Sequence, residues 1–171
     1  MLELGLPQVD AAQWFVTQPQ QEFTRVSVEA HAAATWGLIL RDAVRRAYIS
    51  DQKLDNSAQT TQQSRAVVLA SKLPDAGSVM SGDFGEILGY IYLASRNPEQ
   101  PMIGPKRWRL KQDRTKAAPG SDVVQFILPA WPNASDQDRV VCAEVKAKAT
   151  PGAFDPIAKA IEGSQLDSTS R

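Results

Sequence analysis

Hydrophobic residues recur along this chain at regular spacings, and the spacing predicts which segments are helices. Over residues 27–49 and 82–95, apolar side chains fall three and four positions apart, which is typical of a helix with one buried face. The stripe of the second helix consists of Phe84, Ile87, Leu88 and Ile91. Residues 51–64 are polar and indicate a connection or an exposed helical turn, whereas the short apolar run in residues 65–73 fits a strand or a helix.

Two later segments are rich in Val and are short enough to be strands. Residues 122–128 and 140–147 are separated by a polar loop, which predicts a hairpin. Side chains alternate between the faces of a strand, so Glu144 and Lys146 share one face while Val145 lies on the other. Charges in an apolar strand are costly to bury unless they are paired, hydrated or metal-bound. The alternative is a salt bridge on the surface, which contributes little to stability.

Glu86 lies about 200° around its helix from Phe84, so it points away from the apolar stripe. The sequence around it resembles a capping box, in which Asp83 caps the helix and Glu86 reaches back to it. A capping role and a metal-binding role are compatible in the first turn. Gly85 and Gly89, four positions apart, would let another backbone come close on their own face. A last helix is expected from residue 155, with an aspartate cap followed by proline.

Composition narrows the classes of protein to consider. A chain of 171 residues with 43% hydrophobic residues is long enough for one domain with a core. The single histidine, His31, and the single cysteine, Cys142, exclude a structural zinc site of the usual kind. The apolar runs are shorter than the ~20 residues that cross a bilayer. One cysteine also favours a reducing compartment, so we expect a cytoplasmic protein without a membrane segment.

Acidic and basic residues balance at 19 each, but the basic residues are unevenly placed. A basic block precedes Asp122 and consists of Lys106, Arg107, Arg109, Lys111, Arg114 and Lys116. Alternation at Trp108 and Leu110 permits a strand with one apolar and one basic face. A run of charges is usually only a solvated face. Its position beside Asp122 nevertheless favours a surface that contacts phosphates, with Lys148 as a further contact.

The order of acidic residues along the chain resembles that of the PD-(D/E)XK nuclease superfamily. An acid on a helix is followed by an acid that opens a strand, and then by Glu-x-Lys in the next strand. The three elements are Gly85-Glu86, Gly120-Ser121-Asp122 and Glu144-Val145-Lys146. Within that superfamily, residues 82–86 and the motifs after them are most similar to the nuclease subunit of the Hachiman antiphage defence system. The resemblance covers about residues 80–171.

The resemblance implies an α/β fold of the restriction-endonuclease-like kind, with a mixed sheet flanked by helices. Residues 1–79 would form a largely helical N-terminal region that packs on the core, and residues 80–171 would form the nuclease core. In that fold another strand normally follows the last helix, and none is visible here. We therefore expect a core that is incomplete at the C-terminus, interrupted in its last helix.

The function that the resemblance implies is metal-dependent hydrolysis of DNA phosphodiester bonds in antiphage defence, with RNA left open as a substrate and a helicase-type protein as partner. Glu86, Asp122, Glu144 and Lys146 are the expected catalytic residues, and the three acids are the expected ligands of Mg²⁺ or Mn²⁺. Partial burial beside the metal should disfavour the ammonium form of Lys146. The alternative function is a non-catalytic module on the same scaffold that binds nucleic acid or a partner protein.

Overall fold

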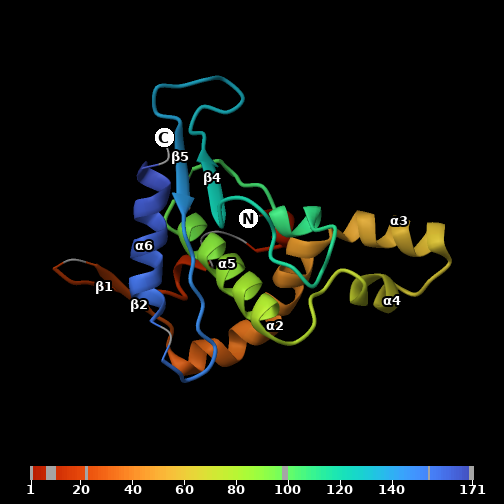
Figure 1. Cartoon of the computed structure of the whole chain (residues 1–171). Helices are drawn as coiled ribbons and strands as arrows, with labels where there is room; N and C mark the ends of the chain where they lie inside the picture. Colours follow the sequence, from red (N-terminus) through yellow and green to blue (C-terminus); the bar gives the residue numbers. More distant parts are fainter. Residues whose placement is uncertain (1, 7–10, 22, 98–99, 154, 170–171) are drawn as a thin grey trace.

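Helices and short strands alternate along the described part of the chain (Figure 1). The computed structural model describes residues 2–6, 11–21, 23–97, 100–153 and 155–169. The α-helices are α2 (Ala30–Tyr48), α3 (Asp51–Thr61), α4 (Arg65–Ala70), α5 (Ser78–Ser95) and α6 (Pro156–Thr169). The strands are β1 (Val16–Pro19), β2 (Thr24–Ser27), β3 (Met102–Ile103), β4 (Val123–Ile127) and β5 (Arg139–Ala143), and the 3-10 helices are η1 (Leu2–Leu4) and η2 (Arg107–Leu110).

The strands form two small antiparallel sheets. β1 pairs with β2, and the second sheet has the order β3-β4-β5. In the predicted hairpin of β4 and β5, Val123 lies opposite Ala143, so continuing the register by one residue places Asp122 opposite Glu144. The α/β class is confirmed. The mixed sheet is not formed, because every strand pairing among the described residues is antiparallel, and the restriction-endonuclease-like architecture stays a prediction.

Helix α5 supplies the centre of the core. Its side chains of Ile87, Tyr90 and Ile91 are almost completely buried. They belong to one apolar cluster with Trp36 of α2 and Val123 of β4. Burying a large apolar side chain contributes ~1.5–3 kcal/mol, so this cluster fixes α5 between the sheet and the N-terminal helices.

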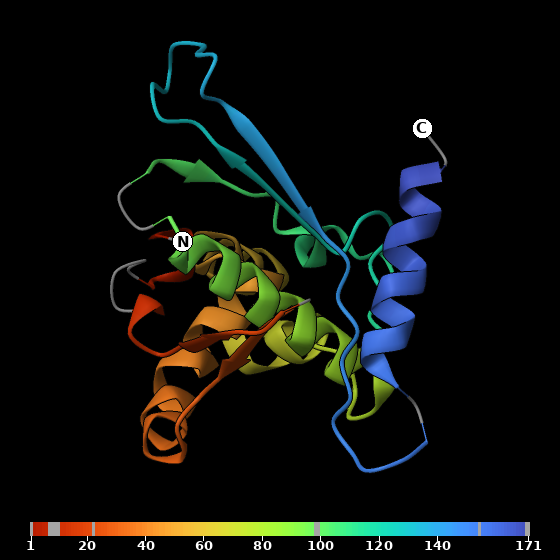
Figure 2. The same cartoon turned by 90° about the vertical axis from the view of Figure 1, so that its left-hand side faces the viewer.

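The chain that follows β5 lies close to α5. Figure 2 shows this segment, residues 144–149, running between α5 on one side and α6 on the other. A Cβ atom built on Gly85 would lie 2.6 Å from the Cβ of Ala147, and one built on Gly89 would lie 3.2 Å from Val145 Cγ2. The close approach expected on the face of these two glycines is therefore confirmed.

The capping box predicted for α5 is wrong, because the helix begins at Ser78, one turn before Asp83. Asp83 is buried in the second turn and accepts hydrogen bonds from Tyr48 Oη, at 2.7 Å, and from Lys111 Nζ, at 2.8 Å to Oδ1. Phe84, expected in the buried stripe, is 44% exposed. The buried face of α5 is shifted by about one residue from the predicted stripe, because Asp83 and Glu86 bind partners in the interior.

A turn of 3-10 helix, η2, takes the place of the strand expected around Trp108 and Leu110. Each turn of a 3-10 helix has 3.0 residues, so residues two positions apart are separated by about 240° around the axis. The side chains of Trp108 and Leu110 therefore point in different directions. Trp108 is 2% exposed, whereas Leu110 is 76% exposed. An alternation of so few residues did not distinguish a strand from a single helical turn.

The N-terminal helices follow the apolar pattern more closely. In α2 the buried residues include Trp36, Leu40, Ala43 and Ala47. The polar segment after it is the helix α3, and the ambiguous segment after that is the helix α4. Both are capped by serine: Ser50 Oγ accepts from Lys53 N and Ser64 Oγ from Val67 N, each at 3.3 Å. The serine caps thus favour helices in these two segments, whose secondary structure the pattern of apolar residues did not determine.

Helix α6 begins as predicted, at Pro156. The carboxylate of Asp155 accepts hydrogen bonds from the amides of Ile157, at 2.9 Å, and Ala158, at 3.2 Å. The aspartate cap and the proline at the first helical position are therefore both confirmed. None of the helices described is both long enough and apolar enough to cross a membrane.

Candidate functional site

Glu86, Asp122, Glu144 and Lys146 lie together where α5, the start of β4 and the end of β5 meet. Arg107 connects the first two of them, since its Nη2 atom is 2.7 Å from Glu86 Oε2 and 3.2 Å from Asp122 Oδ1. Lys146 is ion-paired with Glu144, and both of these residues are close enough to Asp122 to influence its charge. The fold thus brings together four residues that are separated by up to 60 positions in the sequence.

Asp122 links the start of β4 to the segment beyond β5. Its Oδ2 atom accepts a hydrogen bond from the backbone amide of Val145 at 2.8 Å, while Oδ1 accepts one from Arg107. Burial raises the pKa of Asp122, and the neighbouring Glu144 acts in the same direction. The hydrogen bond from Val145 and the positive charge of Arg107 oppose this increase.

Glu86 is held in the interior by two donors on one oxygen. Oε2 accepts a hydrogen bond from Trp108 Nε1 at 2.9 Å in addition to the contact with Arg107. Its side chain is only 9% exposed. Burial raises the pKa of Glu86 more than the contacts with Arg107 and Trp108 lower it. This acid is therefore a buried partner of η2 rather than an exposed group of the first helical turn.

Glu144 and Lys146 lie beyond the last paired residue of β5, in extended chain. They share one side of the segment, as alternation predicts, because Lys146 Nζ donates a hydrogen bond to Glu144 Oε1. That hydrogen bond raises the pKa of Lys146 in the chain without a bound cation, and the effect of a metal ion on its ammonium form stays a prediction. Helix α6 packs against Glu144, since a Cβ atom on Gly163 would lie 3.1 Å from Glu144 Oε1.

The arrangement of these residues fits a metal site with two carboxylate ligands better than a metal site with three. Within the part of the chain that the structure describes, no three His, Cys, Asp or Glu side chains are gathered closely enough to hold a metal ion. Arg107 lies between Glu86 and Asp122, which keeps these two carboxylates apart. Asp122 and Glu144 remain on opposing strand ends. Mg²⁺ accepts such a pair because it keeps several waters and takes one or two carboxylates.

Half of the basic block is used inside the protein. The side chain of Lys106 is 6% exposed and donates to the carbonyl oxygen of Gly104 at 2.8 Å, and burial lowers the pKa of Lys106. The side chain of Lys111 is 4% exposed and is paired with Asp83. Arg107 is bound to the acids of the site. These three cations therefore stabilise the fold around η2.

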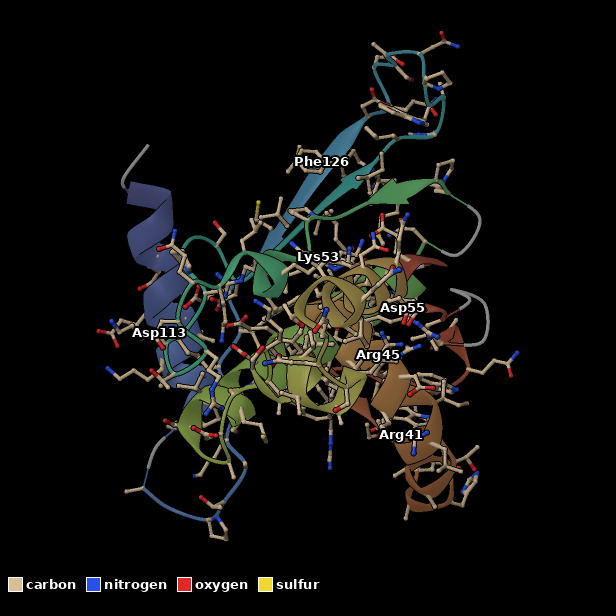
Figure 3. All side chains as sticks on the ribbon, turned by 90° about the vertical axis from the view of Figure 1, so that its right-hand side faces the viewer. Arg41, Arg45, Lys53, Asp55, Asp113 and Phe126 are labelled. Carbon is tan, nitrogen blue, oxygen red and sulfur yellow. The ribbon has the colours of Figure 1, made fainter. Side chains whose placement is uncertain are left out.

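The other predicted contacts to nucleic acid lie nearer the surface. Arg109 donates to the backbone oxygen of Arg46 at 2.8 Å, and Arg114 donates to that of Leu73 at 3.0 Å. The side chain of Lys116 is 78% exposed, and Lys148 is also exposed. Whether any of them binds nucleic acid stays a prediction. Figure 3 shows that another pair of basic residues, Arg41 and Arg45 on α2, lies far from α6.

Two parts of this arrangement were not predicted from the sequence. Arg107 was expected to contact phosphate, and nothing in the sequence indicates that it bridges Glu86 and Asp122. The buried group formed by Tyr48, Asp83 and Lys111 was also missed, because its members come from three distant segments. The apolar sequence around Asp83 was the one available signal that this acid is buried.

Comparison with known proteins identifies the family. No curated protein and no solved structure matches the chain. A family model described as HamA matches residues 17–171. This match includes most of the N-terminal region, in which the sequence offered no recognisable motif. Because this match spans nearly the whole sequence, the chain belongs to the HamA family, which is the family of the Hachiman antiphage defence protein HamA.

Proposed function

We propose that this protein is a metal-dependent nuclease that hydrolyses DNA phosphodiester bonds as its part in Hachiman defence. The observation that supports the proposal most directly is the register of β4 and β5. Continued by one residue beyond Val123 and Ala143, this register brings Asp122 opposite Glu144, and Lys146 is ion-paired with Glu144. Two carboxylates and an amine at one point are the groups that phosphodiester hydrolysis with a divalent ion requires.

Each residue has a defined task in this proposal. Asp122 and Glu144 would hold one Mg²⁺ or Mn²⁺, which supplies an activated water and offsets the negative charge that develops on the phosphate. Lys146 would leave its pairing with Glu144 when that carboxylate binds the ion, and would then donate a hydrogen bond to the phosphate or to the attacking water. The hydrogen bond from Val145 N to Asp122 holds the two strand ends together.

One observation favours the alternative, a non-catalytic binding module. Every charged side chain of the site already has a partner of opposite sign: Arg107 bridges Glu86 and Asp122, and Lys146 pairs with Glu144. Such a closed network would also be expected of acids that serve only the fold. The two functions differ in whether a divalent ion enters the network.

Plasmid cleavage separates the two functions. We expect the protein to nick or linearise plasmid DNA with Mg²⁺ or Mn²⁺ and not with EDTA. Lys146→Ala should abolish cleavage while the circular dichroism spectrum stays unchanged. Lys159→Ala is the matched control, because this lysine on α6 is 56% exposed and pairs with Glu162 of the same helix. A protein that neither cleaves DNA nor binds Mn²⁺ would support the non-catalytic module.

The nucleic-acid surface and the partner protein belong to the same proposal. Lys116 and Lys148 are the predicted contacts whose exposure suits binding to phosphate. Replacing either by alanine should weaken DNA binding to a similar extent for all sequences. The slope of log K against log salt concentration should become shallower by ~1. A helicase-type partner would control the nuclease. Co-purification of the chain with a helicase-type protein, and the effect of that protein on cleavage, tests this part of the proposal.

A further inference from the structure

We infer that Arg107 is the permanent second cation of this site. It occupies the position between Glu86 and Asp122 where a second divalent ion would have to bind. The site therefore takes one ion only, at Asp122 and Glu144, and Glu86 is a positioning residue that holds Arg107. This inference rests on the proposed nuclease function, since it concerns how the same acids are divided between a metal ion and the protein's own charges.

The guanidinium group is fixed from two sides. Nη2 bridges the acids, at 2.7 Å from Glu86 Oε2 and 3.2 Å from Asp122 Oδ1. Nη1 donates to three successive backbone oxygens in the loop before β4, at 3.0, 3.3 and 2.7 Å. These acceptors belong to Ala118, Pro119 and Gly120. A planar fork with donors on both nitrogens suits this position in a way that a lysine does not.

Exchange of Arg107 for a metal ion is unfavourable for a structural reason. Its side chain is 11% exposed, and the loop oxygens that accept from Nη1 would lose their donor if it left. Glu86 would also keep only the neutral donor Trp108 Nε1 for a buried carboxylate. A group held by five contacts, three of them to backbone, behaves as part of the scaffold rather than as an exchangeable ion.

The charge balance favours one divalent ion. Glu86, Asp122 and Glu144 carry three negative charges, and Arg107 and Lys146 carry two positive ones, which leaves one net negative charge. One Mg²⁺ changes this to a single positive charge, which matches the single negative charge of a phosphodiester. A second divalent ion would leave three positive charges in a partly buried space, where like charges repel strongly. Removing Arg107 would relieve this repulsion and free two carboxylates.

Mn²⁺ binding to the full chain, measured by electron paramagnetic resonance of the free ion, tests the inference without using activity. We expect wild type to bind one equivalent, and Arg107→Met to bind a second. Arg107→Lys keeps a positive charge and should still bind one. Arg109→Met is the matched control, because Arg109 is a similarly packed arginine of η2 that contacts neither Glu86 nor Asp122. Circular dichroism checks that each variant is folded.

The possible outcomes are distinguishable. Two equivalents in wild type would overturn the inference and leave the nuclease proposal intact. One equivalent in both wild type and folded Arg107→Met would also overturn it, since Arg107 would then not be what limits the site. No binding by wild type would refute the metal site and the inference with it. If Arg107→Met does not fold, Arg107→Gln, which keeps hydrogen-bond donors for the loop oxygens but carries no charge, is counted in its place, and one equivalent in this folded variant would overturn the inference.

Discussion

The contact between α5 and the segment that carries Glu144 and Lys146 can be tested at Gly85. Replacing Gly85 by alanine adds a methyl group 2.6 Å from the Cβ of Ala147 and 3.7 Å from its Cα. Carbon atoms pack best at ~3.5–4.0 Å, so the segment has to move away by about 1 Å. The neighbour cannot rotate aside, because its Cβ is attached directly to the backbone.

The magnitude follows from comparison with Gly82 on the same helix. A Cβ atom at Gly82 has no neighbour within 4 Å. Gly82→Ala should therefore stabilise the protein by the helix-propensity difference of ~0.8–1.0 kcal/mol. Gly85→Ala has the same gain but must also accommodate overpacking, which costs ~1–3 kcal/mol. The free energy of unfolding should thus be ~1–3 kcal/mol lower for Gly85→Ala than for Gly82→Ala.

Urea denaturation followed by tryptophan fluorescence measures this difference. With m values of ~1–3 kcal/mol/M for small proteins, the two midpoints should differ by about 1 M. Mn²⁺ binding should weaken in Gly85→Ala, because Glu144 moves with the displaced segment, and stay unchanged in Gly82→Ala. If the two variants unfold at the same urea concentration, the segment does not pack on α5 as described here.

Three further changes test the buried charges and the cover of the site. Lys111→Met leaves Asp83 as an unpaired buried charge and should lower stability by ~3–5 kcal/mol, whereas the double variant with Asp83→Leu should recover most of it in thermal unfolding; equal loss in both would contradict this. Burial holds the folded-state pKa of Glu86 above 4.5, so the folded chain takes up its proton before the unfolded chain does. Wild type should therefore gain stability relative to Glu86→Gln as pH falls through that raised pKa toward 4.5, and a loss would mean that the contact with Arg107 outweighs burial. Gly163→Ala should raise stability by ~0.8–1.0 kcal/mol while the new methyl group displaces the carboxylate of Glu144 and weakens Mn²⁺ binding; a lower unfolding midpoint would argue against this packing of α6.

Features that depend on neighbouring residues were predictable from the sequence. The hairpin of β4 and β5 followed from two apolar runs around a polar loop, and its register, continued by one residue beyond Val123 and Ala143, brings Asp122 opposite Glu144. The helix cap at Asp155 and the space beside Gly85 followed from residue type and spacing alone. In each case the residue types and their spacing within one short segment carried the signal, even where the partner, such as Ala147 beside Gly85, lies far away in the sequence.

Features that depend on distant partners were not predictable in this way. Asp83 has the composition of a helix cap, but its hydrogen bonds come from Tyr48 and Lys111, 35 and 28 positions away. Arg107 was predicted to contact phosphate, whereas it bridges two acids that lie on α5 and at the start of β4. Periodicity reports which face of an element is apolar. It contains no information about which polar residue finds a partner once the elements are packed.

The position of Glu144 and Lys146 beyond the last paired residue of β5 determines how the site responds to mutation. Because the sheet ladder ends at Ala143, no strand pairing fixes these two residues. They are held by the hydrogen bond from Val145 to Asp122, by the contact with α5 and by the cover of α6. The contact with α5 involves backbone, so changes at Gly85 should alter stability and metal binding together. The contact at Gly163 of α6 involves the flexible side chain of Glu144, so changes at Gly163 should alter metal binding without loss of stability.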